Sequence, residues 1–172
     1  MPSLRSLSLV LVALSSASAS RLPANLEPFG PEQVCVGRAE VQVRGKADAN
    51  LTQAAQDVLK QLGTSLKLGA AGGSYTACPA WLYFQVNAGN EGGGGLVYAA
   101  TLSLVAPGVQ TKALENLQNE SFDYDGGFEY VTLWSETGYN TAANLENLSF
   151  KLRAEVVSQM DAFSADWKKG HH

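Results

Sequence analysis

Cys35 and Cys78 are the residues whose type and context point most directly to chemistry, and they are the only cysteines in the chain. They follow an N-terminal stretch with the features of a secretory signal peptide. In an oxidising compartment, an even pair of cysteines usually forms a disulfide. We therefore expect a structural Cys35–Cys78 bridge, because neither cysteine lies in a redox-active Cys-x-x-Cys motif. The alternative is a pair of buried thiols.

Histidine occurs only at the C-terminal end, as His171 and His172. Terminal residues fray, so neither imidazole is expected to be held in place as a base or a metal ligand. This argues against Ser-His-Asp and Cys-His nucleophilic sites, and against His-based zinc or copper sites. The sequence therefore predicts no metal and no cofactor.

Four carboxylates are close in the sequence and belong to the residue types used in acid–base or metal chemistry: Asp123, Asp125, Glu129 and Glu136. Asp123 and Asp125 resemble part of a calcium loop, but the later ligands of an EF-hand are missing. Glu129 and Glu136 are of the type that a glycosidase uses as its acid and base. Nothing in the sequence places them in a common cleft, so solvated surface charges are the simpler interpretation.

Aromatic residues form a candidate binding face on the expected strand Trp81–Val86. Successive side chains of a strand point to opposite faces, so Trp81, Tyr83 and Gln85 share one face and the aliphatic residues share the other. If the aliphatic face is the core, the aromatic face is open, and we expect such a face to be a docking or ligand surface. In the alternative, a second layer of chain from Val109 to Asp125 covers it.

The N-terminal residues indicate export. Arg5 supplies a positive charge, Leu7–Leu14 is an apolar run too short to span a bilayer, and Ala17–Ala19 is a small-residue cleavage site. No second long apolar run follows, so we expect no membrane span. The predicted division of the chain is a cleaved signal peptide (1–19), a Pro-rich extended arm (20–33), a single α+β domain (34–169) and a disordered tail (170–172).

The spacing of apolar residues predicts four strands and two helices in the order β-α-β-β-β-α. The strands are expected at 34–44, 81–86, 96–105 and 128–134, and the helices at 51–62 and 145–167. Asn50 is expected to cap the first helix and Gly63 to end it. In the first strand, the side chains expected to share one face are those of Cys35, Gly37, Ala39, Val41 and Val43.

The expected disulfide also constrains the topology. Cys35 begins the first strand and Cys78 immediately precedes the second. Their Cα atoms come within bridging distance if these strands are parallel neighbours joined by a crossover through the first helix. We therefore predict an α+β fold with a mixed four-stranded sheet and both helices packed on one face.

The composition excludes one class of partner. The chain is mildly acidic, with a formal net charge of −4 at pH 7, so it lacks the basic patch of a nucleic-acid-binding protein. Its charged fraction of 16% is low compared with the typical ~25%. A surface with few charges is consistent with contact with a partner.

Four short motifs carry a resemblance to known proteins: Leu82–Asn87, Thr132–Trp134, Thr137–Tyr139 and Asp161–Trp167. They resemble the strand, strand end, glycine turn and helix end of small exported bacterial proteins of unknown function. The order of elements is also similar to the small α/β domains of the TolB N-terminal and curli-secretion types. Neither resemblance implies a catalytic residue.

These features together favour a non-enzymatic binding or assembly module of the bacterial cell envelope, exported to the periplasm, the cell surface or the medium. Its expected partner is an envelope or surface protein. The alternative is a small carboxylate-using hydrolase or a small-ligand carrier, in which at least two of the four acidic residues converge in a pocket.

Overall fold

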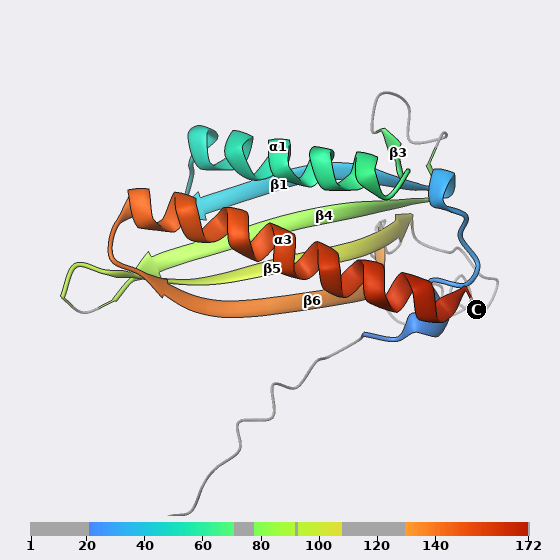
Figure 1. The fold of residues 1–172 in the computed structure, drawn as a ribbon. Coiled ribbons are helices and arrows are strands. Elements are labelled where there is room, and N and C mark those ends of the chain that lie inside the picture. Colours follow the sequence, from blue (N-terminus) through green and yellow to red (C-terminus); the bar gives the residue numbers. More distant parts are fainter. Residues whose placement is uncertain (1–20, 71–77, 92, 108–129, 172) are drawn as a thin grey trace, which may run out of the picture.

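A computed structural model describes residues 21–70, 78–91, 93–107 and 130–171 (Figure 1). The expected signal peptide lies outside these residues. So do Asp123, Asp125 and Glu129, together with the segment Val109–Asp125, which covers the aromatic face in the alternative interpretation.

The chain forms an α+β fold, as predicted, with a mixed sheet and two long helices on one face of it (Figure 1). The elements are 3₁₀ helices η1 (Pro23–Asn25) and η2 (Pro31–Gln33), strands β1 (Val34–Val43), β2 (Lys46–Ala47), β3 (Gly69–Ala70), β4 (Ala80–Asn90), β5 (Leu96–Pro107) and β6 (Tyr130–Ala142), and helices α1 (Ala49–Ser65) and α3 (Leu145–Gly170).

The sheet has six strands rather than the predicted four. Its spatial order is β2-β1-β4-β5-β6, and β3 also pairs with β1. The two additional strands have two residues each and were too short to leave a periodic pattern in the sequence. They lie along the same edge of β1, with β2 antiparallel at its C-terminal end and β3 parallel at its N-terminal end.

The predicted parallel pairing of the first and second long strands is confirmed. β1 runs parallel to β4, with Cys35 opposite Trp81, while β4 and β5 form an antiparallel hairpin. The parallel pairing brings Cys35 and Cys78 to a Cα–Cα distance of 5.8 Å, and the two cysteines form the predicted disulfide. β6 pairs antiparallel with β5 and ends the sheet.

The core lies between the sheet and the two helices. Trp134, Phe84 and Phe163 are its largest fully buried side chains, and the rings of Trp134 and Phe163 meet edge to face at 5.3 Å. The helix α1 lies over β1, whereas α3 lies over β5 and β6 (Figure 1). The opposite face of the sheet carries no described helix.

A β-bulge in β1 changes which residues share a face. The register with β4 shifts between Val36 and Ala39, and an extra residue in one strand reverses the alternation that follows it. Cys35 therefore lies on the helix-free face with Trp81, whereas Ala39 lies in the core. The prediction that Cys35 and Ala39 share one face was wrong for this reason.

β6 continues well beyond the expected end at Trp134. Thr137, Gly138 and Tyr139 pair with β5 inside the strand and do not form the glycine turn that the resemblance implied. The glycine lies where β6 approaches α3 closely, because a Cβ atom at Gly138 would be 2.8 Å from Oε2 at the end of the Glu155 side chain. Glu136, expected just past the strand, is within it.

Both ends of α1 differ from their predictions. Asp48, not Asn50, is the N-cap, and its Oδ1 accepts a hydrogen bond from the Leu51 N–H. Gly63 lies inside the helix, which ends at Ser65. It is buried against β1, where a Cβ atom would collide with Val36 Cγ2.

We expect Gly63→Ala to lower the free energy of unfolding by about 1–3 kcal/mol, the usual cost of overpacking a core. Helix propensity alone favours alanine, so a net loss identifies the collision with Val36 as its cause. Urea unfolding of Gly63→Ala, Val36→Ala and the double variant tests this, because Val36→Ala should restore room for the new methyl group. Additive effects in the double variant would contradict it.

The N-terminal arm is packed against the body of the protein and is not extended. Its residues form η1 and η2, and Leu26 is fully buried in the core. His171, the residue before the last, also has fixed contacts, because its ring stacks on Trp167 and its Nε2 lies 2.8 Å from the Phe29 carbonyl oxygen. The arm and the end of α3 therefore hold each other in place.

Candidate functional site

The helix-free face of the sheet contains the predicted binding residues. The aliphatic side of β4 is the core side, so Trp81, Tyr83 and Gln85 point the other way. Their exposure differs along the strand: Trp81 is 8% exposed, Tyr83 is half-buried and Gln85 is exposed. Only the outer part of the predicted set is therefore available at the surface.

Trp81 packs in a small second core on this face. Its neighbours there are Cys35 and Cys78, with Tyr83 and Val105 at the margin. The guanidinium carbon of Arg38 lies 5.4 Å from the centroid of the Tyr83 ring, within the range of a cation–π contact. This end of the face thus stabilises the disulfide and the β1 bulge.

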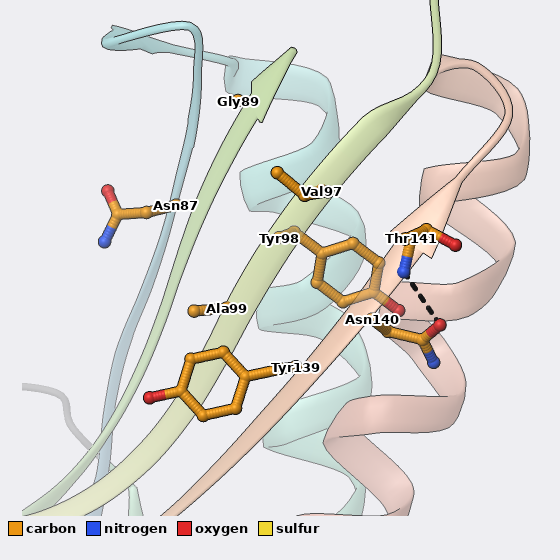
Figure 2. Close-up of a pocket in the computed structure, with 8 residues that line it drawn as sticks. All are labelled: Asn87, Gly89, Val97, Tyr98, Ala99, Tyr139, Asn140 and Thr141. Carbon is orange, nitrogen blue, oxygen red and sulfur yellow. Dashed lines mark hydrogen bonds between the residues drawn. The ribbon is translucent and has the colours of Figure 1, made fainter. Parts of the chain in front are cut away.

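An open groove occupies the other end of the same face and has a volume of about 490 Å³ (Figure 2). Gly89 and Ala99 leave its floor free of large side chains, and Val97 is 42% exposed. Tyr139 stands at one side and is 81% exposed, the highest exposure among the large apolar side chains described. Asn87 lies at the opposite side, on β4.

Strand pairing explains how the groove forms. Ala99 lies between Asn87 of β4 and Tyr139 of β6 in register, so the three residues share one row across the sheet. In Figure 2, Asn87, Ala99 and Tyr139 project to one side, while Tyr98 and Asn140 point toward the helices. Because the middle residue of the row is alanine, the groove lies between an amide and an aromatic ring.

The groove has the chemistry of a binding surface. Its exposed groups are an aromatic ring, apolar carbons and a side-chain amide, and the adjoining Thr101 and Thr137 hydroxyls bond to each other at 3.0 Å. The titratable groups among its lining residues are Tyr98 and Tyr139. Such surfaces gain affinity from the burial of apolar area and specificity from a few polar groups.

Tyr98 lines the groove with its backbone side but does not act as an acid or base there. Its hydroxyl points toward α3 and donates to Glu155 Oε1 at 3.2 Å. Burial, the neighbouring Glu155 charge and this hydrogen bond raise the pKa of Tyr98 above its ordinary value. The hydroxyl stays protonated at neutral pH and joins β5 to the helix.

Glu136 is the described member of the four acidic residues, and it lies away from the groove. Its register partner on β5 is the core residue Leu102, so it points to the helix side. Glu136 Oε2 lies 3.4 Å from an Arg21 guanidinium nitrogen, and Arg21 also binds Asp166 of α3. In this position Glu136 holds the N-terminal arm.

Within the described residues, no cluster of three or more histidine, cysteine or acidic side chains is placed to hold a metal ion. None of the helices in that part of the chain is both long enough and apolar enough to cross a membrane.

Val97, Asn87 and Tyr139 were not among the residues predicted from sequence. Tyr139 is expected in a turn, Asn87 ends a strand motif of the resemblance with no binding role, and Val97 belongs to no motif. A signal for Tyr139 does exist, since Ser135, Thr137, Tyr139 and Thr141 alternate with core-side residues if the strand is extended through Gly138. The row across three strands depends on register, which the sequence does not show.

Comparisons with family models, with curated proteins and with solved structures found no match to this chain.

Proposed function

We propose that this protein is a non-enzymatic binding or assembly module of the bacterial cell envelope, exported to the periplasm or beyond, that recognises an envelope or surface protein through its helix-free sheet face. The observation that carries the proposal is the groove beside Tyr139. Exposure of a large aromatic ring to water is unfavourable, and 81% of the Tyr139 surface is exposed, so a partner that covers the ring lowers the free energy of the system.

The composition of the groove supports a protein partner. Tyrosine is enriched at protein interfaces because it combines a large apolar area with a polar tip and few rotatable bonds. Val97 adds exposed apolar area beside it, and Asn87 and the threonine hydroxyls offer hydrogen bonds at the margin. The described lining residues include no charged side chain, so desolvation of the groove on binding costs little.

The disulfide supports an extracytoplasmic location. Such bonds persist in oxidising compartments and are rare where thiols are kept reduced. The Cys35–Cys78 bridge lies on the same face as the groove and fixes β1 to the segment that leads into β4. A rigid sheet face is well suited to bind without paying for reordering.

A small-ligand carrier is the second candidate, and the size of the groove favours it. Its volume of about 490 Å³ falls within the range of small-molecule sites, roughly 300–1,000 Å³. The groove is open rather than enclosed, however, whereas carriers bury most of the ligand surface. We therefore place the protein partner first.

Val97→Arg is expected to abolish capture of the partner from a detergent-solubilised envelope extract. The arginine places a charge and added bulk in the groove, where a partner would bury it unpaired. Val157→Arg is the matched control, since Val97 is 42% and Val157 is 41% exposed but Val157 lies on α3. The control should capture the same stoichiometric partner as the unmodified chain.

Two results would contradict this proposal. Equal capture by Val97→Arg and by the unmodified chain would exclude the groove as the docking surface. A small molecule released from the native protein, seen by native mass spectrometry and lost in Val97→Arg, would favour the carrier instead.

A further inference from the structure

Among the described residues, the outer edge of β6 has side-chain caps at both ends and, in the middle, backbone groups of Thr137 and Tyr139 without a hydrogen-bond partner. At one end, Asn25 Nδ2 donates to the Leu133 carbonyl at 2.7 Å. At the other, Lys151 Nζ donates to the Thr141 carbonyl at 2.6 Å, and the Thr141 N–H donates to Asn140 Oδ1 at 2.8 Å. Capping is how proteins protect sheet edges, so the uncapped middle stands out.

Strand alternation shows which groups in the middle face outward. The Ala88 carbonyl accepts a hydrogen bond from Arg44 on the β1 side, so its register partner Tyr98 directs its backbone groups toward β6. The backbone groups of Tyr98 therefore bond with those of Asn140. The backbone groups of Thr141, the next residue, then point outward, and the cap on the Thr141 carbonyl confirms this. Thr137 and Tyr139 point the same way, because alternate residues share a direction.

The N–H and C=O groups of Thr137 and Tyr139 have no hydrogen-bond partner among the described residues, and β6 is the last strand on this side of the sheet. Four backbone groups are therefore open on one short segment. Both side chains are exposed on the helix-free face.

We propose that this edge binds a second copy of the chain, with β6 antiparallel to the partner's β6 about a two-fold axis at Gly138. In this register Thr137 lies opposite the partner's Tyr139, and the reverse. Each such pair exchanges two N–H···O=C bonds, so all four open groups on each chain are satisfied. A two-fold interface requires a surface that is complementary to itself, and this edge meets that condition.

The side chains favour the same register. On the helix side, Glu136 of one chain lies opposite Asn140 of the other, and Lys151 Nζ is 3.4 Å from Asn140 Oδ1 within its own chain. Each Glu136 carboxylate thus approaches the Lys151 ammonium of the other chain across the seam, which is the contact between the two β6 strands. By symmetry this approach occurs twice. On the other side, Tyr139 packs over the partner's Thr137, a cross-strand pair of the favourable type.

Pairing in this way makes one continuous sheet from two chains and places both helix layers on the same side. The two grooves then lie next to the seam on the opposite side, and each contributes its Tyr139. Tyr139 belongs to both the groove and the seam, but the two proposals are tested at different residues, because Val97 lies on β5, one strand away from the seam.

Cross-linking of the full chain tests the register. In Thr137→Cys plus Tyr139→Cys, each new thiol lies opposite its complement in the other chain, at the roughly 5.5 Å Cα separation of a hydrogen-bonded pair, which a disulfide accepts. We expect a disulfide-linked dimer under mild oxidation. Either single variant should give little disulfide-linked dimer, because the Cα atoms of the same residue in the two chains are roughly 9 Å apart.

Sedimentation equilibrium tests the association itself. Thr137→Pro removes an outward N–H at an edge position that tolerates proline, and it should weaken the dimer about tenfold or more. Thr137→Val keeps the N–H and should leave the dimer constant unchanged. Monomer alone at about 1 mM chain, the weak end of specific binding, would overturn the proposal. A dimer that Thr137→Pro does not weaken, and that the two introduced cysteines do not cross-link, would also overturn the proposal.

Discussion

Replacement of Cys35 and Cys78 by serine is expected to lower the free energy of unfolding by about 4 kcal/mol. The bridge joins residues separated by 43 positions, and in the chain-entropy model a closed loop of this length restricts the unfolded chain by that amount. The two sulfurs also pack against Trp81, so the loss should not be smaller than the entropic value. Urea unfolding monitored by tryptophan fluorescence measures it.

The unmodified chain with its disulfide reduced is the matched control, since it keeps both sulfurs and loses only the bond. It should unfold at nearly the same urea concentration as the double serine variant. A loss below about 1 kcal/mol would mean that the unfolded chain is already restricted there, or that the bridge is strained in the fold. Equal unfolding of all three forms would contradict the stabilising role of the bridge.

The parts of the fold that were predicted correctly depend on local patterns or on one covalent constraint. The stripe of α3 and the aromatic run of β4 have a clear period, and a bridge from Cys35 to Cys78 requires the parallel pairing of β1 with β4. These features were sufficient to predict helix α3, strand β4 and the parallel pairing of β1 with β4. Alternation along β4 also placed Gln85 away from the core, as the structure has it, whereas binding at this face stays a prediction.

The errors occurred where tertiary contacts override local preference. Gly63 and Gly138 were assigned to a helix end and a turn, the usual places for glycine. Gly63 is instead a position where Val36 of a neighbouring strand leaves no room for a Cβ atom, and Gly138 lies inside β6 where the strand approaches Glu155 of α3. The groove was missed for the same reason, because Asn87 and Tyr139 meet only through the register of β4, β5 and β6.

The packed arm depends on long-range contacts of the same kind. Three prolines between Arg21 and Pro31 indicate an extended segment, but Leu26 enters the core and Arg21 reaches Asp166 of α3. A single charged residue gives no sign of its partner 145 positions away. This contact nevertheless involves a buried charged side chain, and the second large effect follows from it.

Asp166→Ala is expected to lower the free energy of unfolding by about 3–5 kcal/mol, the cost of removing one partner from a buried charged network. Asp166 is 3% exposed, and its Oδ2 accepts from Arg21 Nε at 2.8 Å and from Trp134 Nε1 at 3.1 Å. Alanine leaves the indole N–H of a fully buried tryptophan without an acceptor. Guanidinium unfolding at neutral pH measures the loss.

Two variants separate the parts of this network. Asp166→Asn keeps an oxygen for the Trp134 N–H and removes the charge, so its loss should be smaller than that of alanine. Glu136→Gln breaks only the half-exposed 3.4 Å contact with Arg21 and should cost about 1 kcal/mol or less. If Glu136→Gln cost as much as Asp166→Ala, burial of Asp166 would not be the source of the effect.

The pH dependence of the free energy of unfolding tests whether the charge of Asp166 is the stabilising feature. Burial alone would raise the pKa of Asp166, but hydrogen bonds from Arg21, Trp134 and Lys169 together outweigh it and hold the pKa below its usual value. A carboxyl group whose pKa is lower in the folded than in the unfolded state binds its proton more weakly in the folded protein. Its contribution to the free energy of unfolding is therefore complete above the pKa of the unfolded state, and it declines as the pH falls through the pKa of the folded state. The unfolding free energy of the unmodified chain should therefore fall more steeply in acid than that of Asp166→Asn. Parallel acid profiles of the two would show that Arg21 and Trp134 hold a neutral oxygen as well as a carboxylate.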